Sequence, residues 1–281
     1  MNGLVIIHYN DYESLKHLVD NVKNYSCLDK IIIVDNKSRD EEIEKVRELV
    51  TDKIELIENK SNYGFSYAIN VGAKRCRSLG MDNVFISNCD VVIKDESDLV
   101  KLLSYVDNFD IGVVGPVIEE FGTLNRGWRN PSPLLDSLMN MVGIHRHIRN
   151  KYIFYKEDHY KNEISYVDVV SGCFFLMKTS VLEDIGYLDD NVFLYYEENI
   201  LAKKIKNIGK KNIIVNGVHI IHNHSVSIDK NVKKIKKLKL QKKSQYYYHK
   251  KYNHANILEL ILLKTTAVVN RWILRVVYLF K

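Results

Sequence analysis

The 281-residue sequence has few of the residues that cross-link or interrupt a fold. It contains three prolines and four cysteines, and the cysteines show neither a C-x-x-C pairing nor the spacing of a zinc site. We therefore expect four reduced thiols. No low-complexity linker or fixed-period repeat is present. With 46% hydrophobic residues, the chain can bury one sizeable core, as a single domain with an appendage.

Two nucleotide-binding motifs are also missing. No G-x-G-x-x-G follows the first apolar run and no G-x-x-x-x-G-K-[ST] occurs anywhere, so neither a dinucleotide fingerprint nor a P-loop is available. A bound diphosphate would need another counter-ion, and a metal held by acids would serve. The apolar stretch at the N-terminus is too short for a signal peptide, and no basic region precedes it, which favours the cytoplasm.

Acidic residues are nearly absent from the end of the chain. Residues 230–281 hold 14 lysines and arginines and one acid, Glu259, whereas residues 1–229 hold 27 basic and 34 acidic residues. An acidic body with a basic tail predicts attachment to an anionic surface, either a membrane or a nucleic acid. We therefore divide the chain into a domain of residues 1–229 and a tail of residues 230–281.

Strand-like and helix-like segments alternate along the first ninety residues. Four apolar runs are typical of buried parallel strands, and they cover residues 3–9, 30–36, 54–59 and 83–90. Segments of helical periodicity separate them at residues 12–24, 39–50 and 64–79. This order predicts an α/β fold with a doubly wound, Rossmann-like and mostly parallel sheet, which binds ligands at the carboxyl ends of its strands.

The second half predicts a mixture of strands and short helices. Residues 164–178 read as one long strand-like stretch, and residues 211–224 predict two short strands. The polar loop of residues 119–133 is long enough to be functional. It carries three large side chains to which the spacing assigns no role, namely Arg126, Trp128 and Arg129.

Polar side chains follow each of the four predicted parallel strands. Helix capping explains isolated cases such as Ser38 and Asp40. Four successive strand ends instead fit a polar ligand that lies across one edge of the sheet. The residues concerned are Tyr9, Asn10, Asp35, Asn36, Ser38, Asn62, Gly64, Asn88 and Asp90.

Five segments, in order, resemble the family 2 inverting glycosyltransferases, and most closely their bacterial rhamnosyltransferase-like members. They read VDNKS at 34–38, NYGFSYAINVG at 62–72, SNCDV at 87–91, SGCFFLMKTSVLEDIGYLDDNVFLYYEE at 171–198 and HNHSVS at 222–227. The resemblance implies a GT-A fold, a nucleotide-diphosphate-sugar donor (dTDP- or UDP-linked), Mg²⁺ or Mn²⁺, and a single displacement that inverts the anomeric carbon.

The resemblance assigns the metal to Asp90 and His222. Asp90 stands at the carboxylate of a D-x-D-like motif, and hard cations take such oxygen ligands together with phosphate oxygens. Asn88 replaces the first acid, where it would orient the sugar or phosphate or simply form a turn. His222 precedes Ser227 by five residues, as the family histidine does, and imidazole suits Mn²⁺. His224 is an alternative ligand.

The resemblance assigns catalysis to Glu197 and Glu198, and the base position matches Glu198. An inverting transfer needs one base to take the proton of the acceptor hydroxyl. Two acids in a first helical turn also suit the helix dipole, so capping is the alternative. The family usually carries a further Asp two residues after the pair, where this sequence has Ile200.

The donor contacts are implied by the same resemblance. A core tyrosine and turn amides are the structural alternatives for these residues. The expected contacts are Tyr9, Asp35, Asn36, Asn62, Gly64, Asn70 and Asn88.

The tail predicts a basic amphipathic helix over residues 257–280. Lys264, Arg271 and Arg275 fall within ~40° of one another on a helical wheel. These charges oppose a spanning helix, whereas Trp272 and the cationic stripe suit a helix in the membrane interface. The alternative is packing on the domain or on a second copy, as in a homodimer.

These observations predict a peripheral enzyme on the cytoplasmic face of the cell membrane. It would add one sugar to a polyprenyl-diphosphate-linked glycan during bacterial surface polysaccharide (capsule) biosynthesis, with no nucleic acid as partner. A sugar-phosphate nucleotidyltransferase is the enzymatic alternative, opposed by the missing Gly-rich basic loop after the first strand. A non-catalytic nucleotide-sugar-binding scaffold is the other, suggested by Asn88 and Ile200.

Overall fold

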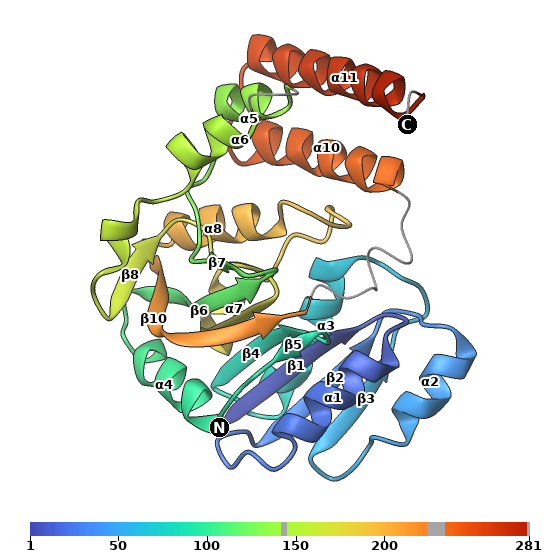
Figure 1. Ribbon diagram of the computed structural model, residues 1–281. Helices are drawn as coiled ribbons and strands as arrows, with labels where there is room; N and C mark the ends of the chain where they lie inside the picture. Colours follow the sequence, from blue (N-terminus) through green and yellow to red (C-terminus); the bar gives the residue numbers. More distant parts are fainter. Residues whose placement is uncertain (142–144, 224–233, 280–281) are drawn as a thin grey trace.

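The computed structural model describes residues 1–141, 145–223 and 234–279, with side chains omitted at 234–235 and 274–279 (Figure 1). A ten-stranded mixed sheet crosses the molecule. Apolar helix residues cover both of its faces as two separate core clusters. This arrangement confirms the predicted α/β class.

The first half is the predicted doubly wound unit. Its four strands are mutually parallel: β1 (Asn2–His8), β2 (Lys30–Asp35), β3 (Ile54–Glu58) and β4 (Asn83–Asn88). Its helices are α1 (Tyr12–Val22), α2 (Asp40–Arg47) and α3 (Phe65–Ser78). Apolar residues of α1 and α2 join one core cluster and those of α3 join the other, so consecutive strand ends meet at one edge between the helix layers.

The second half adds both antiparallel and parallel pairs to this sheet. Its strands are β5 (Val91–Val92), β6 (Ile111–Glu120), β7 (Thr123–Asn125), β8 (Ile164–Val167), β9 (Phe174–Lys178) and β10 (Lys211–His222). Its α-helices are α4 (Glu96–Val106), α5 (Pro133–Met139), α6 (His145–Ile148), α7 (Thr179–Asp184) and α8 (Glu197–Asn207). The strand order is β3-β2-β1-β4-β9-β6-β10-β5, with β7 paired to β6 and β8 paired to β10. Strand β9 lies antiparallel between β4 and β6.

Two predicted strand patterns were wrong. The stretch 164–178 is broken into β8 and β9, because β8 pairs with β10 and the chain then leaves that pairing, with Val169 bridging Trp128. The stretch 211–222 is one strand, because its pairing with β6 resumes after a register shift between Val215 and His219. The Asn and Gly inside that bulge had the sequence pattern of a turn.

The C-terminal region forms two helices, α10 (Lys234–Lys251) and α11 (Ile257–Leu279), and α11 corresponds to the helix predicted over residues 257–280. Figure 1 shows α10 between α8 and α11, with α5 and α6 beside them. The boundary predicted at residue 229 lies outside the described residues. Within the described chain, no helix combines the length and apolar character needed to cross a membrane.

Candidate active site

The ends of β1 and β2 are joined by a buried carboxylate. Asp35 Oδ1 lies 2.8 Å from His8 Nδ1 and accepts a hydrogen bond of 2.5 Å from the Ser38 hydroxyl, while Oδ2 accepts one of 2.9 Å from the Ser38 amide. Burial by itself would raise the pKa of Asp35, but the bonds from His8 and Ser38 hold it below the ordinary value. Asp35 is therefore a fixed anion at the strand ends.

Asn36 organises the turns that follow β2 and β3. Its amide nitrogen donates to Asn62 Oδ1 and to the Gly64 carbonyl, both at 3.1 Å, and its oxygen accepts from Asn59 Nδ2 at 3.2 Å. Gly64 has φ +97°, and a Cβ there would lie 2.5 Å from the Phe193 carbonyl oxygen. The absence of a side chain at Gly64 therefore lets the backbone lie close to the segment that leads into α8. We call His8, Asp35, Asn36, Ser38, Asn59 and Asn62 the strand-end network.

Asn70 and Tyr9 lie beside this network without joining it. The Asn70 side chain donates to the Leu188 carbonyl and accepts from the Leu188 amide, both at 2.9 Å, which ties α3 to the chain before α8. Tyr9 is half-buried, and its backbone hydrogen-bonds to Cys89. A donor contact from either side chain stays a prediction.

A second cluster joins the ends of β4, β6 and β10. His222 Nε2 lies 3.2 Å from Asp90 Oδ1, and Nδ1 lies 2.9 Å from Glu120 Oε1. The Asn88 amide nitrogen lies 3.4 Å from His222 Nε2. Ligand atoms of Glu120, Cys173 and His222 all fall within 4.8 Å of one another. We call Asn88, Asp90, Glu120, Cys173 and His222 the Asp90 cluster.

The Asp90 cluster has the donor set of a divalent-cation site. Burial by itself would lower the pKa of His222, but hydrogen bonds with Asp90, Cys173 and Glu120 outweigh it and raise the pKa to about 12. A cation would take the place of the proton that His222 holds between two carboxylates. Carboxylate oxygens suit Mg²⁺, and the added imidazole suits Mn²⁺, so the residues present fit the predicted metal.

Glu120 and Cys173 were missed by the sequence interpretation. Glu120 ends β6 as Asp90 follows β4, and an acid at the end of a strand was the available signal. Cys173 precedes β9, a strand whose place beside β4 is set by long-range pairing. His224 and Ser227 lie outside the described residues.

The two candidate catalytic acids open α8 after a distorted turn. Tyr195 and Tyr196 have φ of +70° and +68°, and Glu197 is the first helical residue. Glu197 is buried, and among the described residues its Oε2 has no hydrogen-bond partner. Burial and the neighbouring Glu198 raise the pKa of Glu197 well above its ordinary value. Glu197 is thereby favoured in its neutral form.

Glu198 faces a cavity of about 560 Å³, which we call the Glu198 cavity. Burial raises the pKa of its carboxyl, although backbone hydrogen bonds, including one from Gly172, lower it in part. A Cβ at Gly172 would lie 2.8 Å from Glu198 Oε1, so the carboxylate rests against the backbone one residue before Cys173. Glu198 therefore lies between the cavity and the Asp90 cluster.

The polar loop of residues 119–133 contributes Trp128 to the wall of the Glu198 cavity. Its two arginines make structural contacts instead. Arg126 pairs with Glu157 at 2.6 Å, and the Arg129 guanidinium lies 4.0 Å from the centre of the Tyr155 ring. These contacts anchor the loop to the segment before β8.

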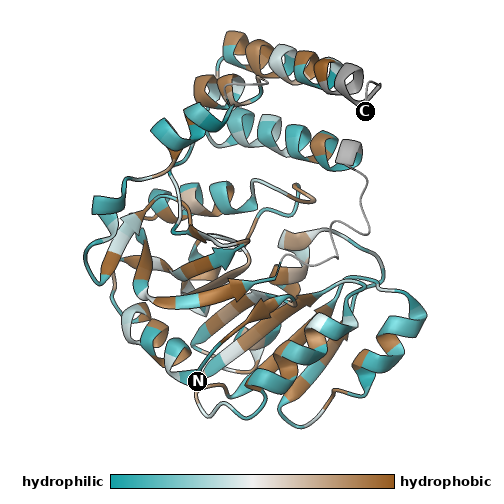
Figure 2. Ribbon diagram, viewed as in Figure 1, coloured by the Kyte–Doolittle hydropathy of each residue, from teal (hydrophilic) through white to brown (hydrophobic). Residues whose placement is uncertain are grey.

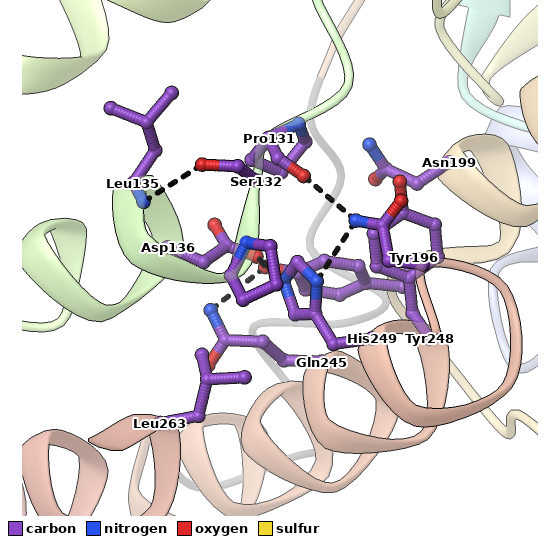
Figure 3. Close-up of polar contacts among 12 residues, drawn as sticks. Pro131, Ser132, Leu135, Asp136, Tyr196, Asn199, Gln245, Tyr248, His249 and Leu263 are labelled. Atoms are coloured by element: carbon purple, nitrogen blue, oxygen red, sulfur yellow. Dashed lines mark hydrogen bonds and ion pairs between the residues drawn. The ribbon is translucent and has the colours of Figure 1, made fainter. Parts of the chain in front are cut away.

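A buried hydrogen-bond network holds α10 against the N-terminal end of α8 (Figure 3). Asp136 Oδ2 accepts a bond of 2.6 Å from the Tyr196 hydroxyl and lies 2.6 Å from His249 Nε2. Gln245 Nε2 donates to the Tyr196 hydroxyl at 2.9 Å, and Tyr248 donates to Asn130 at 3.0 Å. The residue before Glu197 is thus bonded directly to the C-terminal region, which the sequence did not indicate.

Comparison with known proteins decides the family. Residues 4–186 match the family described as glycosyl transferase family 2, which is more than half of the chain. The chain belongs to glycosyl transferase family 2. This confirms the resemblance and the fold that it implied.

Two relatives are similar over most of the chain. The low-salt glycan biosynthesis hexosyltransferase Agl10 of Haloferax volcanii is 26% identical over 233 residues, which cover 80% of this chain and 67% of the relative. The dTDP-rhamnosyl transferase RfbF of Shigella flexneri is 24% identical over 219 residues, which cover 78% of this chain and 67% of the relative.

Solved glycosyltransferases share the fold at low identity. GalNAc-T7, crystallised with UDP, GalNAc and Mn²⁺, gives a TM-score of 0.63 at 15% identity over 80% of this chain, which spans 44% of that structure. The mannosyltransferase PcManGT of Pyrobaculum calidifontis, in complex with GDP-Man and Mn²⁺, gives a TM-score of 0.60 at 15% identity, and the match covers 96% of this chain and 71% of that structure. The mixed sheet described above is therefore the GT-A fold of family 2.

Proposed function

We propose that this protein transfers one sugar from a nucleotide-diphosphate-sugar to a glycan acceptor, with inversion and with Mg²⁺ or Mn²⁺ at the Asp90 cluster. The observation that carries the proposal is the position of Glu198 between that cluster and an open cavity. Gly172 contacts the Glu198 carboxylate, and the next residue, Cys173, belongs to the cluster. A departing diphosphate and an attacking hydroxyl would meet at this place.

The side chains supply the proton transfer. Glu198 would accept the proton of the acceptor hydroxyl, and the raised pKa makes its carboxylate a stronger base. A neutral Glu197 beside it would avoid repulsion between two adjacent carboxylates. A cation held by Asp90, Glu120 and His222 would stabilise the charge that develops on the departing diphosphate.

The donor to test first is dTDP-rhamnose, followed by UDP-sugars. The family 2 relative that is a dTDP-rhamnosyl transferase supports this order. Asn36, Asn62 and Gly64 form one hydrogen-bonded turn next to Asp35, where a nucleoside could lie across the strand ends.

The acceptor proposed here is a lipid-linked glycan at the inner face of the cell membrane, in the assembly of a bacterial surface polysaccharide. The exposed apolar side chains of α11 support a membrane surface as partner, because Ile257 is 74% exposed and Trp272 is 67% exposed. Figure 2 shows apolar residues along α11, whereas α10 is mostly hydrophilic. A homodimer that covers α11 is the alternative, and vesicle binding by the monomer would exclude it.

The scaffold alternative loses one of its two arguments. Ile200, which replaces the usual acid, is 1% exposed and packs with Tyr248 of α10. The departure from the family pattern therefore accompanies the docking of α10 on α8. Membership of family 2 counts against the nucleotidyltransferase alternative.

The test is a panel of nucleotide sugars with Mn²⁺ or Mg²⁺, read as acceptor-dependent release of the nucleoside diphosphate. We expect one donor to turn over, and Asp90→Ala to lose both turnover and metal-dependent donor binding while staying folded. Donor binding without turnover under any condition would support the scaffold. Full activity in excess chelator would remove the metal from the proposal.

A further inference from the structure

A second cavity, of about 360 Å³, lies between α10 and α11, and we call it the lysine groove. Its cationic lining residues are Lys239, Lys242, Lys243, Lys264 and Arg271. Its apolar lining residues are Leu263, Ala267 and Val268, and no acidic residue lines it. Five cations in one groove repel one another, so this surface favours an anionic ligand.

The lysine groove adjoins the Glu198 cavity. Lys242 and Gln245 line both of them, so Lys242 marks the junction. The Lys242 ammonium donates to Asn140 Oδ1, and no carboxylate of the described residues lies within ion-pair distance of it. A path therefore runs from Glu198 past Lys242 into the space between the two helices.

Arg149 is a second cation that lines the Glu198 cavity. Its guanidinium lies 4.7 Å from the centre of the Phe154 ring and has no carboxylate partner among the described residues. Burial lowers the pKa of both Arg149 and Lys242. Lys242 is partly buried and Arg149 is exposed. A partly buried cation without a counter-charge is costly, and a bound anion would remove that cost at Lys242.

Apolar side chains continue outward from the lysine groove on α11. They are exposed, and they include Ile257, Leu258, Ile261, Val268, Val269 and Trp272. Val268 belongs to both sets, since it lines the groove and is exposed. A ligand with an anionic head and a hydrocarbon chain matches the groove and this surface together.

We propose that the lysine groove binds the diphosphate of a prenyl-diphosphate-linked acceptor, with Lys242 directing the attached sugar into the Glu198 cavity and the hydrocarbon chain lying on α11. This site rests on the proposed transfer to a lipid-linked glycan. The junction at Lys242 favours the acceptor over a bulk anionic lipid, because a headgroup that only anchors the protein needs no connection to Glu198. Lysine is well suited to such a site as a compact charge for phosphate oxygens.

The experiment measures binding of farnesyl diphosphate to the full chain without donor or metal. The double variant Lys242→Gln/Lys264→Gln should bind it at least about tenfold more weakly, a change of about 1.4 kcal/mol, because it loses two charges that would contact the diphosphate. Lys250→Gln, an exposed lysine of α10 outside the groove, should bind within about twofold of the parent. Thermal unfolding confirms that all three proteins are folded.

Three results would overturn the site. The first is equal farnesyl diphosphate binding by the double variant and the Lys250→Gln control. The second is pyrophosphate or farnesol binding as tight as that of farnesyl diphosphate, which would remove the joint recognition of head and chain. The third is that the double variant loses binding to phosphatidylglycerol vesicles but still binds farnesyl diphosphate as the parent does, which would make bulk lipid the occupant.

The outcome separates this site from the transferase proposal. If no donor turns over but the double variant still weakens farnesyl diphosphate binding, the site stands and the transferase proposal fails. If a donor turns over and the double variant binds as the parent does, only the site fails.

Discussion

The strand-end network lies at the edge of the sheet and the Glu198 cavity lies among α5, α8 and α10, and their polar groups are bonded differently. In the network, the polar side-chain atoms of Asp35 and Asn36 form hydrogen bonds to neighbouring residues at 2.5–3.2 Å. Around the cavity, Arg149 and Lys242 have no ion-pair partner within the described chain, and Glu197 Oε2 has no hydrogen bond there.

This difference separates a rigid region from a region that awaits a ligand. Buried polar groups that bond to one another fix a geometry before any ligand arrives. Buried or partly buried groups that lack a hydrogen bond or a counter-charge in the described chain, such as Glu197 and Lys242, are costly in an empty site, and they are found where a ligand or a reaction supplies the missing charge. Substitutions of residues whose polar atoms are bonded within the protein should therefore change stability, and substitutions of the unpaired groups at the cavity should change catalysis or acceptor binding.

The largest effect is expected from Glu198→Gln. The amide keeps the shape of the side chain but cannot take the acceptor proton, so turnover should fall by ~10²–10⁴-fold, or about 3–5 kcal/mol in the barrier. Donor affinity, measured by titration, should change little, because Glu198 lies on the cavity side.

The matched control is Glu197→Gln, which alters the adjacent buried acid. A few-fold effect is expected, since that acid is already favoured in its neutral form. If Glu197→Gln is the more damaging change, the base is the first acid of the pair. If neither matters, the catalytic interpretation of the pair fails.

Asp136→Ala should give the next largest effect, on folding. It removes the acceptor shared by Tyr196 and His249 and leaves two buried donors unpaired, which costs about 2–5 kcal/mol of unfolding free energy. Urea denaturation measures it. Asp20→Asn, at an exposed carboxylate on α1, should leave the urea midpoint unchanged. Equal midpoints for the two variants would mean that the network of Figure 3 does not stabilise the α10 docking.

Asn70→Ala tests whether Asn70 stabilises the fold or contacts the donor. Loss of both bonds to the Leu188 backbone should cost about 1–3 kcal/mol of unfolding free energy. Because both polar atoms are occupied within the protein, the donor dissociation constant should stay within a few-fold of the parent. A large loss of donor affinity with unchanged stability would restore the donor contact that the family resemblance implies.

The smallest effect is a gradual change of activity with pH. Burial raises the pKa of Glu198 above its ordinary value of 4.5, and a base acts only when deprotonated. Activity should therefore be full above the raised pKa and fall up to about tenfold per pH unit below it. A profile of kcat/KM that stays flat down to pH 4.5 would contradict the assignment.

The sequence predicted the first half of the fold well because its signals are local. Each of β1 to β4 is a continuous apolar run, and each intervening helix has its own periodicity. The break between β8 and β9 and the bulge in β10 were missed because distant partners cause them. Val169 bridges Trp128, and β10 must stay in register with β6 on both sides of the bulge.

The candidate site divides in the same way. Asp90 and His222 were found from short motifs, and the structure brings them within 3.2 Å. Glu120 was missed because a single acid at the end of a strand becomes informative only when its neighbours are known. Asp136 and His249 were missed because they are more than a hundred residues apart and meet only when α10 docks.

The bonds that Tyr196 makes also limit how this enzyme can diversify. A recombination event that brought α10 from a relative would break the bonds to Asp136 and Tyr196 unless the incoming helix carried matching residues. Tyr196 would then lose the contacts that support its left-handed backbone. Changes of acceptor range in this lineage should therefore appear as joint substitutions in α5, α8 and α10, inherited together.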